Sequence, residues 1–175
     1  MRPIALILAL LVARATGVAA QGAPARPVVV VLNLRFDDEH ANVRQPTDTA
    51  VVASATSKLL ATLAASERVT LVDSGTVADR VRAAEADGNP CDNACAVAVA
   101  RGLGARWVAT GTITNLSGLV WILTAELLDA STGKPVLADS YEIKGDAARM
   151  APAGAHVFSQ RVEKAMITAA QAAAP

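Results

Sequence analysis

Apolar residues recur along this sequence with two different periods, which separate predicted strands from predicted helices. Residues 28–34 form a nearly continuous β-branched apolar run, which is typical of a strand buried on both faces. Turn residues bound four further strand-like segments, and the stretches 117–118 and 131–135 supply hairpin turns between the last three of them. These four segments are residues 69–72, 107–115, 119–129 and 136–143.

Helical spacing begins after residues 35–46, a charged stretch without periodicity that reads as a surface loop. Thr47 or Asp48 can cap a helix whose apolar positions recur three or four residues apart and which ends near Ser66. The same reasoning predicts three more helices, the second of which closes at Gly104. They cover about residues 76–86, 93–103 and 153–173.

The predicted order of elements is β-α-β-α-α-β-β-β-α, and this order defines the fold class. An early strand–helix–strand unit needs parallel pairing, whereas strands joined by short turns pair antiparallel. We therefore expect a single α/β (α+β) domain over residues 28–175, with a mixed sheet of about five strands and helices packed on it. Its tail should fray from about residue 170.

Residues 1–20 read as a Sec-type signal peptide. Arg2 gives the positive start, the apolar stretch after it is too short to span a bilayer, and Val18-Ala19-Ala20 is a small-x-small cleavage site. A cut after Ala25 also fits, and a buried amino-terminal helix or a membrane anchor is the alternative to export. Residues 21–27 would form a flexible, proline-containing leader. No cysteine lies near either cut, so we predict a periplasmic protein that is not a lipoprotein.

Composition and charge exclude several classes of function. Without residues 1–20 the chain keeps 14 basic and 16 acidic side chains, so its charge is about −2. Nucleic acids and anionic membranes select basic patches, and an aromatic content of 3% leaves little for stacking on bases. No later run approaches the ~20 apolar residues of a transmembrane helix, so we predict no membrane span after signal cleavage.

The sequence carries no motif of an enzyme active site. No serine lies in a Gly-x-Ser-x-Gly elbow, and Gly102-Leu103-Gly104 ends a predicted helix where a dinucleotide site would begin one. Residues 37–40, Asp-Asp-Glu-His, could attract a hard cation, but they lack the spacing of a calcium loop and read as a solvated loop. We therefore expect a protein that is not an enzyme and that uses no cofactor and no metal.

Cys91 and Cys95 are the only cysteines of the chain. An even number of cysteines in an oxidising compartment favours a disulfide, and a spacing of four residues at a helix start brings the two Cβ atoms close. The pair could instead serve thiol redox chemistry or copper handling. A soft metal would want a third ligand, and His40 and His156 lie in unrelated sequence contexts.

Trp107 and Trp121 lie on adjacent predicted strands and can face the same side of the sheet. Core packing is the common use of such large side chains. The alternative is a partly exposed aromatic surface that binds a partner.

Two stretches resemble known proteins: residues 102–113, GLGARWVATGTI, and residues 123–138, LTAELLDASTGKPVLA. They resemble the α/β domains of TolB amino-terminal-like and CsgG-like bacterial envelope proteins, and the likeness covers roughly residues 28–145. Its motifs are structural, with Gly104 at a helix stop, Gly111 at a small strand position and Gly133 in a turn. The cysteine pair and the signal peptide resemble, more narrowly, a family of predicted periplasmic proteins of unknown function.

These observations lead to two functional hypotheses. The first is a non-catalytic periplasmic binding or assembly module of the cell envelope, whose partner is another envelope or periplasmic protein. In this hypothesis residues 136–143 form an edge strand that can accept a partner strand. The second is a periplasmic thiol-redox or copper-handling protein that uses Cys91 and Cys95.

Overall fold

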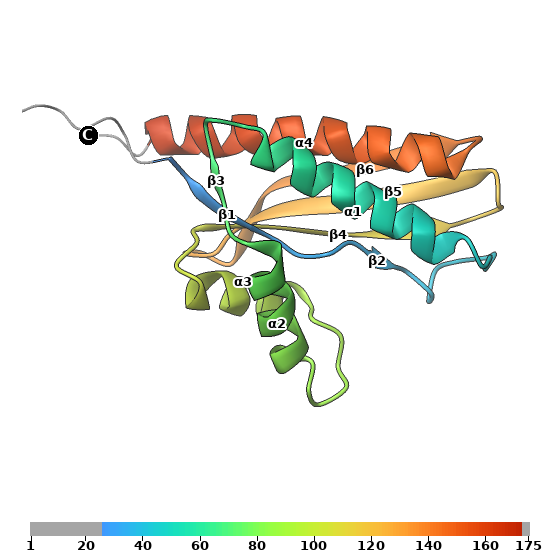
Figure 1. Cartoon of the computed structure of the whole chain (residues 1–175), viewed down its shortest axis with the longest axis horizontal. Helices are drawn as coiled ribbons and strands as arrows, with labels where there is room; N and C mark the ends of the chain where they lie inside the picture. The colour runs from blue at the N-terminus through green and yellow to red at the C-terminus, as the bar shows by residue number, and fades with distance from the viewer. Residues whose placement is uncertain (1–25, 173–175) are drawn as a thin grey trace, which may run out of the picture.

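The structure, a computed structural model, describes residues 26–172 of the 175-residue chain. The predicted signal peptide and both predicted cleavage sites lie outside the described residues. Six strands and four helices follow one another along the described part of the chain (Figure 1). They are β1 (Val28–Val31), β2 (Arg35–Phe36), α1 (Asp48–Ala64), β3 (Thr70–Leu71), α2 (Ser74–Ala84), α3 (Asn93–Gly102), β4 (Trp107–Asn115), β5 (Val120–Asp129), β6 (Lys134–Lys144) and α4 (Ala147–Ala172).

The strands form one mixed sheet in the order β3-β1-β4-β5-β6, with β2 paired to β4. β1 pairs in parallel with both β3 and β4, because helical crossovers join these strands. β4, β5 and β6 pair antiparallel through short turns. The predicted α/β domain with a mixed sheet is thereby confirmed, and β2 adds a sixth strand.

Helices cover the two faces of the sheet unequally. The long helices α1 and α4 lie side by side over one face, and the short helices α2 and α3 pack under one end of the other face (Figure 1). The larger hydrophobic core lies beneath α1 and α4, and a smaller core lies between the sheet and α2 and α3. Outside this smaller core, the second face is exposed to solvent at positions such as Thr124 and Ser140.

Both tryptophans are in the larger core. Trp107 is 1% exposed and Trp121 is 2% exposed, and the ring of Trp121 packs edge-on against Phe36 with centroids 6.5 Å apart. Side chains with so little exposure cannot present a binding surface. The structure therefore contradicts the alternative of an exposed aromatic patch and agrees with core packing.

The predicted strand 28–34 ends at Val31, and a short irregular segment separates it from β2. Leu34 lies in that segment, where its backbone N–H donates to Thr56 Oγ1 of α1 at 3.1 Å. Its side chain fills the space above Gly111, where an added Cβ would lie 3.0 Å from Leu34 Cδ2 and 2.5 Å from the Thr124 carbonyl oxygen. The irregular segment and the small residue on β4 therefore fit together.

Other predicted boundaries also differ from the structure, two of them clearly. Residues 35–46 are not entirely a loop, because Arg35 and Phe36 pair with Thr112 and Ile113 of β4. The last helix begins at Ala147 instead of near residue 153. Asp146 causes the earlier start, since its carboxylate accepts a hydrogen bond of 3.1 Å from the backbone N–H of Ala148.

Candidate functional site

A disulfide closes the turn that leads into α3. Cys91 and Cys95 are bonded, with Cα atoms 5.2 Å apart, which confirms the predicted disulfide. Asp92, at the helix N-cap, accepts a hydrogen bond of 2.9 Å from the backbone N–H of Cys95. The backbone N–H of Cys91 donates to a Glu85 carboxylate oxygen at 2.8 Å. The end of α2 is therefore tied to the start of α3.

The two histidines lie apart from this disulfide. His40 bonds to Asp37 in an exposed loop, and the Nδ1 atom of His156 on α4 lies 3.1 Å from Thr62 Oγ1. Within residues 26–172, no group of three or more His, Cys, Asp or Glu side chains is arranged to hold a metal ion. From that part of the chain, the structure therefore joins no third His, Cys, Asp or Glu to the cysteines in a metal-binding group.

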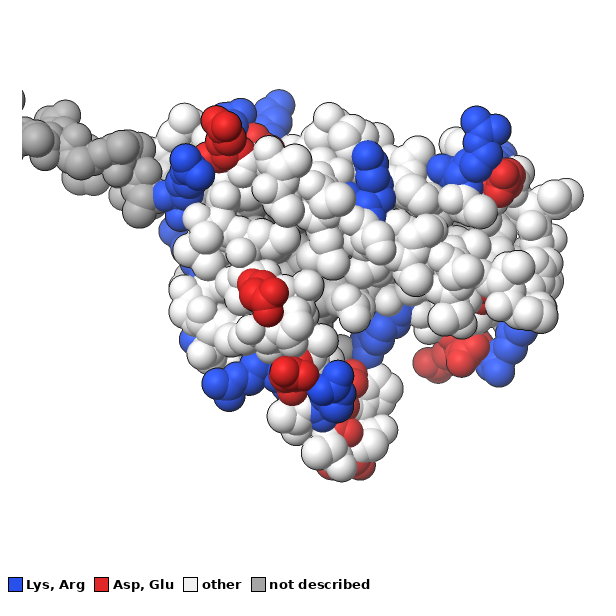
Figure 2. Space-filling model, in the orientation of Figure 1, with Lys and Arg blue, Asp and Glu red and all other residues white. Residues whose placement is uncertain are grey.

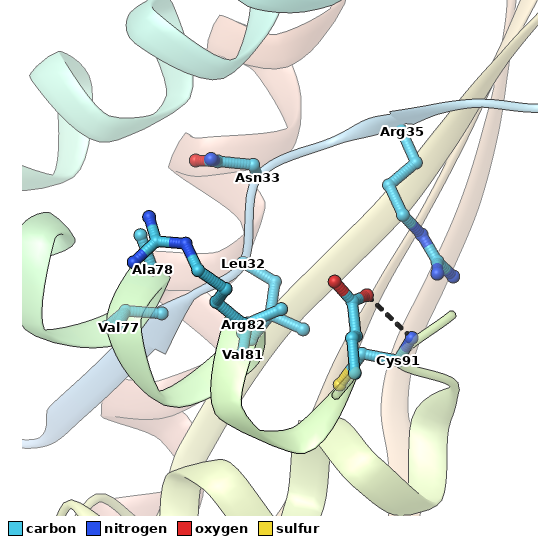
Figure 3. Close-up of a pocket in the computed structure, with 9 residues that line it drawn as sticks. Leu32, Asn33, Arg35, Val77, Ala78, Val81, Arg82 and Cys91 are labelled. Carbon is cyan, nitrogen blue, oxygen red and sulfur yellow. Dashed lines mark hydrogen bonds between the residues drawn. The ribbon is translucent and has the colours of Figure 1, made fainter. Parts of the chain in front are cut away.

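A pocket of about 270 Å³ lies beside the disulfide, between the carboxyl end of β1 and α2 (Figure 3). Leu32, Val77, Ala78 and Val81 form its apolar walls. Its polar lining consists of Asn33, Arg35, Arg82, Glu85 and the backbone of Cys91. Sequence analysis did not predict this pocket, because its residues come from β2, α2 and two connecting segments.

The charged groups of the pocket differ in their partners. Arg82 donates to Asp79 at 2.7 Å, and Glu85 accepts the Cys91 N–H. The Arg35 guanidinium makes no hydrogen bond or ion pair with any described residue, and its Nη1 atom is buried. Its guanidinium extends from β2 toward Cys91 (Figure 3). The free positive charge in the pocket is therefore that of Arg35.

The second candidate feature is β6, an edge strand of eleven residues. It pairs with β5 along one side, and no other described strand pairs with its outer side. Near its start, Val136 has no partner on β5, because Pro135 pairs with Leu128 and Leu137 pairs with Leu127. A proline, a bulge and terminal lysines are devices that discourage strand addition at the ends of an edge. Residues 138–143 lie between these devices.

A shallow apolar groove runs between the start of β6 and the end of α4. Val136 is 46% exposed there, and its neighbours include Leu137, Ala165 and Ala169. Further along β6, the Asp139 carboxylate is held by Arg161 at 2.7 Å and accepts the Tyr141 hydroxyl at 2.8 Å. Burial and the Asp139 hydrogen bond raise the pKa of Tyr141 to about 12.

Asp37 anchors the acidic loop 37–40 to strand β4. Asp37 contacts His40 Nδ1 at 3.0 Å and accepts the Thr114 hydroxyl of β4 at 3.1 Å. Burial alone would raise the pKa of Asp37, but the bonds to His40 and Thr114 outweigh it and lower the pKa. The hydrogen bond and charge of Asp37 raise the pKa of His40. Asp38 pairs instead with Arg44.

Asp129 organises the turn between β5 and β6, and it belongs to residues 123–138, one of the two stretches that resemble known envelope proteins. Its carboxylate accepts hydrogen bonds from the Ser131 backbone and hydroxyl and pairs with Arg106 at 3.0 Å. Burial opposes ionisation, but the Ser131 and Arg106 bonds prevail and lower the pKa of Asp129. Gly133 completes the turn at φ +72°, and Gly104 ends α3 at φ +68°. These residues serve the fold, as the motif predicts.

The surface adds few further signs of a ligand. On the face that Figure 2 shows, acidic and basic side chains lie interspersed among uncharged ones (Figure 2). No helix among residues 26–172 combines the length and the apolar character needed to cross a membrane. The pocket at Arg35 and the free edge of β6 are thus the two candidate sites.

The fold defines a mixed α/β domain with an antiparallel hairpin extension, and comparisons with known proteins place it in a family. Residues 27–160 match DUF3280, described as "Protein of unknown function (DUF2380)", and the chain belongs to this family. No curated protein matches the chain.

Many solved structures match this chain, among them the following two. The LpoB C-terminal domain from Escherichia coli is 22% identical, with a TM-score of 0.50, over 73% of this chain and 89% of that chain. TolB from Acinetobacter baumannii is 14% identical, with a TM-score of 0.51, over 81% of this chain and 28% of that chain. These likenesses show the fold alone, and they confirm the TolB part of the predicted resemblance in that respect. The CsgG-like part stays a prediction.

Proposed function

We propose that this protein is a non-catalytic binding module of the bacterial cell envelope, and that β6 accepts an extended segment of an envelope protein. The free outer edge of β6 carries this proposal, because unpaired backbone N–H and C=O groups are the template for strand addition. The proteins that share the fold, a domain of LpoB and part of TolB, come from bacteria.

Residues 138–143 are the segment best suited to receive a partner strand. Ala138, Ser140 and Glu142 are exposed on one face of this segment. On the other face, Arg161 neutralises Asp139, and the Tyr141 hydroxyl donates a hydrogen bond to it. The Asp139 side chain is only 7% exposed. The inward charge is therefore already satisfied within the domain and does not project toward a partner. Main-chain bonds would give the affinity, and exposed side chains would give the specificity.

The partner can be located with a photocrosslinking residue at position 140 in living cells. The matched control is position 124, because Thr124 is the cross-strand neighbour of Ser140 on β5 and is exposed on the same face. A strand added to β6 lies about 5 Å from Ser140 and about twice that from Thr124. We expect a discrete crosslink to a short extended segment of one envelope protein from position 140 only.

Substitution of the edge provides the second measurement. Ser140→Lys places a charge on the edge strand, whereas Thr124→Lys places the same charge on the neighbouring inner strand. Loss of the crosslinked partner in Ser140→Lys with retention in Thr124→Lys supports strand addition. Equal crosslinking from both positions, or equal loss in both variants, contradicts it.

We also propose that the module works in the periplasm after signal cleavage. The proposal rests on residues 1–20, whose pattern is that of an exported protein. Amino-terminal sequencing of the protein from the periplasmic fraction should return a start at Gln21, or at Arg26 if the cut follows Ala25. An intact Met1 on protein from the cytoplasm would overturn the proposed compartment.

A further inference from the structure

Arg35 carries the one buried side-chain nitrogen or oxygen among residues 26–172 that has no hydrogen-bond partner. Native structures leave few such atoms, and an unpaired charged donor costs more free energy than a neutral one. The atom lies at a pocket lined by Arg35 itself. The partly buried guanidinium of Arg35 therefore lacks a partner of opposite charge among the described residues.

The neighbouring groups do not supply that partner. Glu85 forms no ion pair with Arg35 among the described residues, and one of its oxygens accepts the Cys91 N–H. Arg82 is itself positive and is paired with Asp79. The Glu85 charge also disfavours a doubly charged anion in the same small space. A singly charged anion therefore fits the electrostatics best.

The place of the pocket in the fold favours a ligand site. The chain leaves β1 toward α1 on one face of the sheet, and it leaves the neighbouring parallel strand β3 toward α2 on the other face. In open α/β sheets, ligands bind outside the carboxyl ends of parallel strands where the connections diverge in this way. Leu32 directly follows β1 and lines the pocket at this point.

We propose that this pocket binds a carboxylate carried on a small aliphatic body. The Arg35 guanidinium would take the carboxylate through its planar fork of donors. The apolar walls formed by Leu32, Val77 and Val81 would cover the aliphatic part. A free branched-chain acid, a free amino acid and the carboxyl end of a peptide share this chemistry. The proposal does not depend on strand addition at β6.

The test is a titration of the ¹⁵N-labelled protein, followed by amide NMR shifts, with isovalerate, valine and N-acetylvaline as probes. Isovaleramide is the matched control, since it keeps the shape of isovalerate and lacks the charge. We expect saturable shifts at Leu32, Val77 and Cys91, and affinity for isovalerate roughly tenfold to a hundredfold above that for isovaleramide. The order of affinity for isovalerate, valine and N-acetylvaline shows whether the pocket prefers a free branched-chain acid, a free amino acid or the carboxyl end of a peptide.

Variants assign the binding to Arg35. Arg35→Gln should lower the affinity for isovalerate roughly tenfold or more, and Arg35→Lys should lower it less, because lysine keeps the charge without the fork. Arg80→Gln is the control, because it removes an exposed arginine of α2 that does not line the pocket. Glu85→Gln should tighten isovalerate binding by removing a nearby like charge.

Thermal melts of each variant separate a loss of binding from a loss of folding. If Arg35→Gln does not fold, the comparison of Arg35→Lys with wild type decides the question. Saturable binding that prefers the acid and weakens in the Arg35 variants supports the proposal. Equal affinity for isovalerate and isovaleramide, unsaturable shifts across the surface, or unchanged affinity in the Arg35 variants would overturn it.

Discussion

Glu85, at the C-cap of α2, accepts a hydrogen bond of 2.8 Å from the backbone N–H of Cys91. The bond joins a helix end to a disulfide-closed turn, and both groups line the pocket that contains Arg35. The loop between α2 and α3 is thereby held by the hydrogen bond to Glu85 and by the disulfide. We infer from this arrangement that the disulfide stabilises the fold, and the free energy of unfolding of cysteine variants measures that contribution.

Replacing both Cys91 and Cys95 by Ala should lower the free energy of unfolding by about 1–3 kcal/mol, because the disulfide closes only a short loop. Denaturant melts of the double variant, both single variants and reduced wild type measure the loss. We expect reduced wild type to resemble the double variant. Stoichiometric copper binding by reduced wild type, lost in both single variants, would instead indicate a metal-handling role.

Gly111→Ala should destabilise the fold by about 1–3 kcal/mol, because its Cβ would lie 2.5 Å from the backbone oxygen of Thr124. The matched control is Gly102→Ala at the end of α3, where an added Cβ meets no atom within 4 Å. That change should be neutral or stabilise by up to about 1 kcal/mol, since Ala favours helix. Similar melting temperatures for the two variants would contradict the close packing of β4 against β5.

Asp129→Asn should lower stability at pH 7 by about 1–3 kcal/mol, because it weakens the buried bonds to Ser131 and Arg106. The folded-state pKa of Asp129 lies below its ordinary value of 3.8, so its contribution is present above about pH 4. As the pH falls through the folded pKa, the contribution disappears. Melts from pH 7 to pH 2 should therefore show the two proteins converging in acid.

Asp38→Asn provides the comparison for this series, since the Asp38 side chain is 63% exposed. Its stability at pH 7 should stay within about 0.5 kcal/mol of wild type. A difference between Asp129→Asn and wild type that stays constant from pH 7 to pH 2 would mean that ionisation of Asp129 contributes nothing.

Asp37→Asn should lower the pKa of His40 toward its ordinary value of 6.5, because the Asp37 hydrogen bond and charge raise it in the native loop. Titration of the His40 ring protons by NMR measures the pKa directly. Asp38→Asn should leave it nearly unchanged, because Asp38 pairs with Arg44 and not with His40. A larger shift in Asp38→Asn than in Asp37→Asn would refute the geometry of the loop.

Local sequence determined most of the secondary structure. The predicted strand 107–115 has the observed bounds of β4, and the helix 93–103 differs from α3 by one residue at its end. Periodicity and turn residues suffice there, because they act within a few residues of the chain. The cysteine spacing likewise predicted the disulfide, since four residues at a helix start keep both side chains in reach.

Only the tertiary structure determined what distant segments make together. Two residues, Arg35 and Phe36, have no periodicity of their own and become a strand because β4 supplies their hydrogen-bond partners. The same pairing places Arg35 over α2 and the disulfide turn, and so creates the pocket. Burial of Trp107 and Trp121 also depends on α1 and α4, which cover one face of the sheet. Residue type records that a side chain can be buried, whereas contacts across the fold decide where it lies.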